Sequence, residues 1–305
     1  MSTELELKFA LPEAFLPQLI SLLPSLGQVQ SQDSAGLLNA YFDTADRWFR
    51  RHDMGLRSRK KRGQFEQTLK LAGTQLGALQ QRPEYNLPCS DVTPQLAAFD
   101  AAIWPANTDI VSLQAGLTEL FRTDFHRHSW QLQCPDGSLV ELVYDSGEVR
   151  SADKSEAIAE LELEFISGDA RQLFVLSRQL LAALPLRTGF LSKAARGYLL
   201  AAGKTPELPS YTGDSLAGRL TALQQAEACY RRTQSVAALS AAQALLQQLS
   251  DTLLQQQQAA AAEVALALAR QLMQQPEVFD LPDYNLLLLH LTQQLFVAGA
   301  TSHAS

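Results

Sequence analysis

Cysteine is scarce in this sequence, with only Cys89, Cys134 and Cys229 among its 305 residues. The number is odd, the three positions are widely spaced, and none of them forms a C-x-x-C pair. A disulfide framework and a structural zinc site are therefore not expected, and a reducing compartment fits this composition best.

Long apolar runs are missing as well. No stretch approaches the roughly 20 consecutive apolar residues that a membrane-spanning helix needs, so no membrane span is predicted. The chain starts with acidic residues instead of a basic segment followed by an apolar run, which argues against a secretory signal. We therefore expect a soluble cytoplasmic protein with no membrane partner.

A surplus of positive charge is the third absence. The chain has 25 Lys and Arg against 32 Asp and Glu, which gives a net charge of −7. General nucleic-acid binders normally show a basic surplus, so no nucleic-acid partner is expected, although a local basic cavity remains compatible with this balance. A Walker-type Gly-x-x-x-x-Gly-Lys loop is also lacking, which argues against a P-loop enzyme.

The composition changes after Gly203. Residues 204–213 contain proline and read as a linker, and the chain from 214 onward is rich in Ala, Leu and Gln, with leucines at helical spacing. Pro276 and Pro282 interrupt the last helices. We predict a domain over residues 1–203, a linker over 204–213 and a small all-α domain over 214–305.

The first ten residues alternate strictly between charged and apolar side chains. Glu4, Glu6 and Lys8 alternate with Leu5, Leu7 and Phe9, a period of two that predicts a β-strand with one charged face. Taken alone, such a strand most often turns its charges to solvent. Further strands are predicted over residues 37–44, 81–87, 120–133, 139–149 and 158–166, with a hairpin over 55–71. Helices are predicted over residues 11–26, 93–116, 168–184 and 192–202.

Charged residues recur with the same period on the later strands. Glu160, Glu162 and Glu164 alternate with apolar residues, and three carboxylates on one strand face repel each other unless a cation lies among them. Other charged residues lie on the predicted strand faces: Arg57, Arg59, Lys70, Arg82, Arg127, Glu141 and Asp145.

If every strand turns its apolar face to surrounding helices, the charged faces turn towards one another, and the sheet curls into a barrel with a polar lumen. Carboxylate oxygens without nearby His or Cys suit Mg²⁺ or Mn²⁺, and guanidinium groups match phosphate oxygens. Such a lumen would accommodate a linear polyphosphate.

Several ordered motifs resemble the CYTH superfamily, also called triphosphate tunnel metalloenzymes. Besides the two acidic strands, they are Y-F-D-T at 41–44, H-D-M-G-L-R at 52–57, R-P-E-Y-N at 82–86 and L-S-K-A-A-R-G-Y at 191–198. These details look most like the bacterial inorganic triphosphatases that join a CYTH domain to a C-terminal CHAD domain. The resemblance implies an α+β fold with an eight-stranded antiparallel β tunnel, flanked by helices, that binds triphosphate and needs Mg²⁺ or Mn²⁺, two per site.

The resemblance also implies roles for individual residues. The metal ligands would be Glu4, Glu6, Asp145, Glu160, Glu162 and Glu164. Asp145 would help to bind metal through water or would hold a basic ligand in place. The residues that contact triphosphate would be Lys8, Arg57, Arg59, Lys70, Arg82, Arg127 and Lys193. Catalysis would rest on Lys8, Glu160 and Glu162, with Lys8 polarising the terminal phosphoryl group. Tyr41 and Asp43 are expected to belong to the scaffold instead.

The C-terminal part departs from that family pattern. CHAD domains are usually longer and carry clustered histidines, whereas the region after Gly213 has about ninety residues and only His290 and His303. The function of a CHAD domain is therefore not transferred to this region.

The leading hypothesis is a metal-dependent inorganic triphosphatase that hydrolyses tripolyphosphate to pyrophosphate and phosphate. The alternatives on the same fold are a thiamine or nucleoside triphosphatase and a class IV adenylyl cyclase. A polyphosphate-binding protein without activity is the alternative from another functional class. The sequence predicts no particular oligomeric state.

Overall fold

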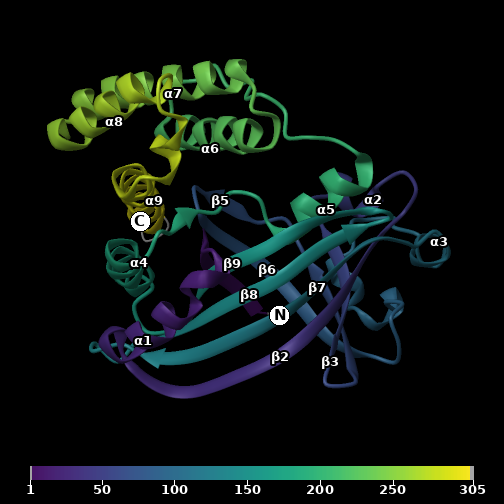
Figure 1. Ribbon diagram of the computed structural model, residues 1–305. Coiled ribbons are helices and arrows are strands. Elements are labelled where there is room, and N and C mark those ends of the chain that lie inside the picture. The colour runs from purple at the N-terminus through teal and green to yellow at the C-terminus, as the bar shows by residue number, and fades with distance from the viewer. Residues whose placement is uncertain (1, 303–305) are drawn as a thin grey trace.

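Eight antiparallel strands close into a barrel in the computed structural model, which describes residues 2–302 (Figure 1). The ring runs in the order β1, β9, β8, β7, β2, β3, β4 and β6, and pairing between β6 and β1 closes it. The strands are β1 (Ser2–Ala10), β2 (Gln28–Asp43), β3 (Gly55–Lys61), β4 (Gln64–Lys70), β6 (Leu79–Cys89), β7 (Thr118–Gln133), β8 (Leu139–Ser151) and β9 (Lys154–Ser167). The predicted fold class is confirmed.

Two short strands extend the sheet beyond this ring. β5 (Thr74–Leu76) pairs with β6, and β10 (Arg187–Thr188) pairs with the end of β1. Neither was predicted, because two or three residues are too few to show a period of two.

The alternation in β1 separates an outer apolar face from an inner charged face. Leu7 and Phe9 are completely buried against α1 (Leu16–Leu26) and α4 (Gln172–Ala183), which cover the outside of the barrel. Burying such a side chain contributes roughly 1.5–3 kcal/mol, so the apolar face sets the orientation of the strand. Glu4, Glu6 and Lys8 consequently face the lumen.

The outer face of β2, β3 and β4 is covered by short elements. These are α2 (Trp48–Arg51), α3 (Ile110–Ala115) and the 3₁₀ turns η2 (Leu96–Ala98) and η3 (Ala101–Ile103). The helical cover predicted over residues 93–116 is therefore confined to one α-helix of six residues and two single turns. Pro94 and Pro105 interrupt this segment, and Asp109 caps the helix by accepting hydrogen bonds from the amides of Val111 and Ser112.

The helix α5 (Lys193–Ala202) packs into the barrel from the end where β8 stops and β9 starts. Its Tyr198 ring lies edge-on to Phe121 with 5.4 Å between ring centroids, and Phe121 shares the lumen-facing parity of β7. A Cβ on Gly197 would lie 2.1 Å from the Phe121 ring, so only glycine permits this approach. The first residue of α5, Lys193, is thereby brought into the charged lumen.

Four helices and a 3₁₀ turn form the described part of the region after residue 213, which ends at residue 302. They are α6 (Leu216–Thr233), α7 (Val236–Gln255), α8 (Ala259–Leu272), η4 (Pro276–Asp280) and α9 (Pro282–Ser302). Leucines and alanines of these helices form one core, as the helical spacing predicted. His303 lies outside the described residues, and the domain boundaries at 203 and 213 stay predictions. Among the described residues, no helix has the length and apolar character to cross a membrane.

This helical region lies against the barrel beside α4 (Figure 1). Leu289 of α9 belongs to the same apolar core as the outer face of β1. Asn285 of α9 accepts a hydrogen bond at Oδ1 from the amide of Thr188 in β10, at 2.8 Å. The helical region thus completes the packing of one side of the barrel.

Candidate active site

The barrel encloses a cavity of about 300 Å³ whose walls are mainly charged. Among the predicted site residues, those that line it are Glu4, Glu6, Lys8, Arg57, Arg59, Lys70, Arg82, Arg127, Glu162, Glu164 and Lys193. Asp145 and Glu160 are buried and do not line this cavity. The structure therefore brings predicted residues from six strands, β1, β3, β4, β6, β7 and β9, and Lys193 of α5 together around one cavity.

The register between β1 and β9 decides which acids meet. Glu6 lies opposite Glu164, and Lys8 lies opposite Glu162, while Glu160 lies opposite Ala10. One carboxylate oxygen from each of Glu4, Glu6 and Glu164 lies within 4.8 Å of those of the other two. The structure therefore groups Glu164, and not Glu160, with the two acids of β1.

These three carboxylates carry an excess of negative charge. Burial, followed by the negative charges of Glu162, Glu6 and Glu4, raises the pKa of Glu164 to about 8, although Arg127 opposes this. Burial likewise raises the pKa of Glu6. For Glu4, burial acts in the same direction, but the nearby Lys70 keeps its pKa below the ordinary value. Crowded carboxylate oxygens of this kind form a donor set that fits a hard divalent cation.

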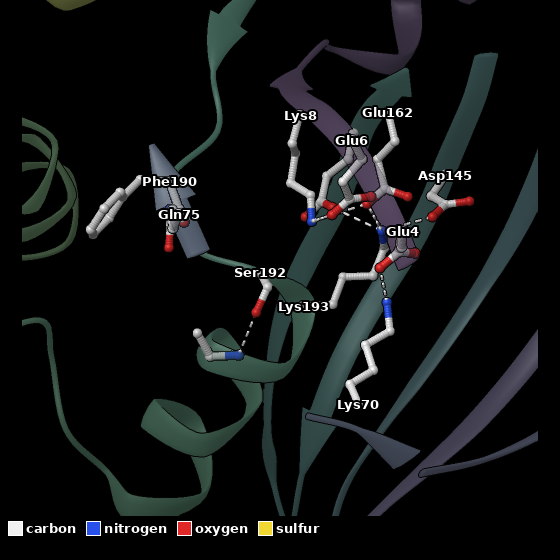
Figure 2. Close-up of polar contacts among 12 residues, drawn as sticks. Glu4, Glu6, Lys8, Lys70, Gln75, Asp145, Glu162, Phe190, Ser192 and Lys193 are labelled. Atoms are coloured by element: carbon white, nitrogen blue, oxygen red, sulfur yellow. Dashed lines mark hydrogen bonds and ion pairs between the residues drawn. The ribbon is translucent and has the colours of Figure 1, made fainter. Parts of the chain in front are cut away.

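The other three acids are neutralised by bases that the chain itself supplies, and Figure 2 shows two of them, Asp145 and Glu162, beside Lys193. Lys193 Nζ lies 2.7 Å from Asp145 and 2.9 Å from both Glu160 and Glu162. Arg127 donates two hydrogen bonds of 2.7 Å to Asp145, which is fully buried. Burial would raise the pKa of Asp145, but Lys193 and Arg127 hold it below the ordinary value.

Lys8 lies between the two groups of acids. Its Nζ is 3.1 Å from Glu162 and 3.4 Å from Glu6. Burial alone would lower the pKa of Lys8, but Glu6 and Glu162 raise it well above its ordinary value. Lys8 is therefore a fixed positive charge in the lumen.

The opposite wall is formed by bases of β3 and its neighbours. Arg59 donates a hydrogen bond from Nε to Asn39 at 2.7 Å. Burial, together with the charges of Arg57 and Arg127, lowers the pKa of Arg59 to about 9. The buried Nε of Arg57 has no hydrogen-bond partner among residues 2–302. This wall has more positive charge than its own acids neutralise, so it suits an anion.

Lys70 and Arg82 complete that wall. Lys70 forms a close ion pair with Glu4 and lies 3.4 Å from Glu84 (Figure 2). Arg82 is held by two backbone carbonyl groups, because it donates to Leu71 O at 2.9 Å and to Asp53 O at 3.0 Å. The guanidinium of Arg82 is thus positioned without an acid partner in direct contact among the described residues.

Some lining residues were not predicted as site residues. Tyr41 was expected to be scaffold, yet it lines the cavity, and although burial opposes this, Arg57 and Arg59 lower its pKa. Tyr41 lies opposite Arg57 in the pair of β2 and β3, a register that the sequence alone does not give. Asp43 does act as scaffold, since it accepts hydrogen bonds from the amide of Phe49 and the hydroxyl of Tyr198.

Arg196 was also missed. It forms an ion pair with Glu160 and donates to Ala157 O at 2.7 Å. It follows Lys193 by three residues, a spacing that puts both side chains on one face of α5. That spacing in the L-S-K-A-A-R-G-Y motif was available in the sequence.

Comparison with known proteins connects this geometry to a family. A family model that describes the CYTH domain matches residues 2–198. The inorganic triphosphatase of Haemophilus influenzae is 31% identical over 200 residues, which are 66% of this chain and 55% of that protein. The chain thus spans about half the length of this relative.

Two solved structures share a more limited similarity with this chain. A Hippeastrum protein with a dominant triphosphatase activity is 19% identical over 66% of this chain and 96% of its own, with a TM-score of 0.44. The triphosphatase of the Mimivirus capping enzyme is 13% identical over 60% of this chain and 88% of its own, with a TM-score of 0.35.

Proposed function

The chain belongs to the CYTH family, and from this premise we propose that its lumen hydrolyses inorganic tripolyphosphate to pyrophosphate and phosphate. CYTH enzymes are metal-dependent, and we propose Mg²⁺ or Mn²⁺ as the ion, two per site. The homology to inorganic triphosphatases supports the reaction, and the residue types of the lumen support the substrate class.

One observation carries the proposal. Across a single cavity, three crowded carboxylates face arginines that have too few acid partners of their own. A divalent cation would neutralise the first group, and the oxygens of a linear triphosphate would neutralise the second. A charged lumen without such ligands would only cost stability.

The metal is assigned to the acids that lack enough counter-charge. Glu4, Glu6 and Glu164 are the proposed ligands, and Glu162, which also lines the cavity, is a further candidate. When bound, the ion would neutralise charge on the phosphoryl group and lower the pKa of a coordinated water. Asp145 and Glu160 contact Lys193 directly, so their proposed role is to hold this base in place.

The bases are assigned to the substrate. Arg57 and Arg59 would each offer paired N–H donors to phosphate oxygens, and Lys70, Arg82, Arg127 and Lys193 would add further positive charge around them. Lys8 would donate to the terminal phosphoryl group, where negative charge is redistributed in the transition state. Water supplies the attacking oxygen, the bond from the terminal phosphorus to the bridging oxygen breaks, and pyrophosphate leaves.

Phosphate release from tripolyphosphate tests this proposal directly. The purified chain with Mg²⁺ or Mn²⁺ should release phosphate, and Glu4→Gln should reduce the rate by about 100-fold or more. Glu148→Gln is the matched control, because Glu148 lies on β8 and pairs with Arg150 away from the lumen. An unchanged rate in Glu4→Gln would refute the assignment of this acid to the active site.

The same assay separates the alternative functions. Comparing kcat/KM for tripolyphosphate, thiamine triphosphate and ATP identifies the preferred substrate, and a search for cyclic AMP tests the cyclase alternative. Tight binding of tripolyphosphate with no phosphate released would favour a polyphosphate-binding protein and would contradict hydrolysis.

A further inference from the structure

A second cavity of about 440 Å³ lies between the barrel and the helical region. Its walls come from the end of β1, the start of β9, β10, α5 and α6. Figure 1 shows α6 beside this part of the barrel. The cavity is distinct from the lumen, although Lys8 contributes to the lining of both.

Four arginines line this second cavity: Arg187, Arg196, Arg231 and Arg232. They come from three different elements, β10, α5 and α6, so the folded chain as a whole gathers them. A guanidinium group has five N–H donors, of which the recorded contacts occupy only some. The side chains of Arg187 and Arg231 are 31% and 28% exposed, so both remain partly accessible.

The acids around the cavity are shared among these arginines. Glu156 pairs with both Arg196 and Arg232. Asp280 lies 3.3 Å from Arg187 and 3.0 Å from Arg231. This sharing leaves positive charge in the cavity only partly neutralised.

Two further acids near the cavity, Glu160 and Glu227, also contact residues other than its arginines. Glu160 pairs with Lys193 as well as with Arg196, and Glu227 accepts hydrogen bonds from Arg231 at 2.8 Å and from the hydroxyl of Tyr284 at 3.0 Å. Burial, and then the neighbouring Arg231, lower the pKa of Arg187. The lining is therefore electrostatically suited to an anion.

Gln224 supplies an independent indication of a ligand. Its side chain lines the cavity and is 1% exposed. Neither its Nε2 nor its Oε1 has a hydrogen-bond partner among residues 2–302. A buried polar group without a hydrogen-bond partner lowers the free energy of unfolding. A ligand that both accepts and donates hydrogen bonds would supply the partners that this amide lacks.

We propose that this cavity is a second anion site that binds an inorganic phosphate, as orthophosphate or pyrophosphate. Phosphate oxygens accept hydrogen bonds from guanidinium groups in paired geometry, and a protonated phosphate also has one P–OH donor. The oxygens can accept from Gln224 Nε2, while the P–OH group can donate to Gln224 Oε1. The proposal does not depend on the activity of the lumen.

Isothermal titration calorimetry of the full chain with pyrophosphate, and separately with orthophosphate, tests the site. Phosphate binding in the lumen is removed by combining Arg57→Ala with Arg59→Ala, and the titrations contain no divalent metal. Binding should persist in this background and weaken at least tenfold when Gln224→Met or Arg187→Met is added. Gln247→Met is the control, because Gln247 is an exposed glutamine on α7.

Thermal melting provides a second readout that does not depend on the lumen variants. Without phosphate, Gln224→Met should melt at or above the wild-type temperature, because methionine removes the unpartnered amide. With phosphate, the shift seen in the wild type should be reduced in Gln224→Met. A cavity that holds only water would give no titration signal in the lumen double variant, and this result would overturn the proposal.

Hydrolysis separates this proposal from the previous one. Gln224→Met should hydrolyse tripolyphosphate at the wild-type rate, since Gln224 does not line the lumen. Loss of all phosphate binding in the lumen double variant, or unchanged binding in both cavity variants, would refute the second site and leave the proposed reaction intact.

Discussion

The barrel interior contains two groups of acids that differ in how they are neutralised. Asp145, Glu160 and Glu162 each contact Lys193 within 2.9 Å. The other group, Glu4, Glu6 and Glu164, is crowded by like charge. Burial of an acid does not by itself identify a ligand site. An acid that is buried without enough positive charge nearby is the better indication of one.

The origin of the difference lies in α5. The three neutralised acids are balanced largely by the first residue of this helix, which is held in the barrel by the packing of Tyr198 and Gly197 on Phe121. Lys193 does not contact the other three acids. The two groups should consequently respond in opposite ways to substitution.

Asp145→Asn should give the largest effect on stability. The substitution leaves Arg127 and Lys193 buried with less negative charge, which typically costs about 3–5 kcal/mol for a broken buried pair. Urea unfolding without metal measures this free energy. Asp124→Asn, at an exposed position of β7, is the control, and equal stability of the two variants would remove the distinction between the two groups.

The pH dependence of this effect has a defined sign. The pKa of Asp145 is lower in the folded state than its ordinary value of 3.8, so its ionised form stabilises the fold above that pH. This contribution is lost as the pH falls from 3.8 through the folded-state pKa. The stability difference between wild type and Asp145→Asn should shrink over this acid range in unfolding curves, and a constant difference would contradict the ionised pair.

Glu164→Gln should instead reduce activity by about 100-fold while leaving stability unchanged or higher. Removing one of three crowded carboxylates relieves repulsion and at the same time removes a proposed metal ligand. Phosphate release and urea unfolding on the same preparation measure both quantities. A variant that is destabilised as strongly as Asp145→Asn would place Glu164 in the neutralised group.

Metal addition should distinguish the two groups of acids by their effect on the Tm. At about 100 times its Kd, an ion that binds only the folded state stabilises it by about 2.7 kcal/mol. We expect Mn²⁺ to raise the Tm of the wild type and of Asp145→Asn, and to raise that of Glu164→Gln much less. Equal shifts in all three proteins would mean that the ion binds elsewhere.

Lys70→Met should have the smallest effect on stability. The side chains of Lys70 and Glu4 are 22% and 18% exposed, so solvent screens their ion pair and its loss should cost less than about 1 kcal/mol. The KM for tripolyphosphate should rise roughly tenfold, because one phosphate contact is lost. An unchanged KM would remove Lys70 from the proposed substrate contacts.

Much of the site was predictable because its residues lie on strands with a period of two. The parity of Glu4, Arg57 and Arg127 put them on faces that meet in the lumen, and the structure brings them together. The grouping of the acids was less accessible. It depends on the register of β1 against β9, which alternation alone does not determine, and a shift of four residues would place Glu160 instead of Glu164 opposite Glu6.

The first half of β2, the packing of α5 and the second cavity could not be predicted, because the local sequence carries too weak a pattern for each. The first half of β2 reads Q-V-Q-S-Q-D-S-A-G, which is mostly polar, and its strand conformation is stabilised by pairing with β7. Nothing in the local pattern of α5 indicates that it packs into a barrel instead of covering it. The second cavity depends on Gln224, which lies in an unremarkable run of α6 and becomes significant only through its burial.

The hydrogen bond between Thr188 of β10 and Asn285 of α9 links the helical region to the position of Lys8. Thr188 precedes Gly189, whose amide donates to Lys8 O at 2.8 Å, and a Cβ at Gly189 would lie 2.8 Å from the side chain of Lys8. A helix at the outside of the molecule and a lysine in the lumen are therefore separated by two linked hydrogen bonds. A displacement of α9 would therefore move β10 first and the backbone of Lys8 next. The position of the helical region thus helps to set the position of this lysine in the lumen.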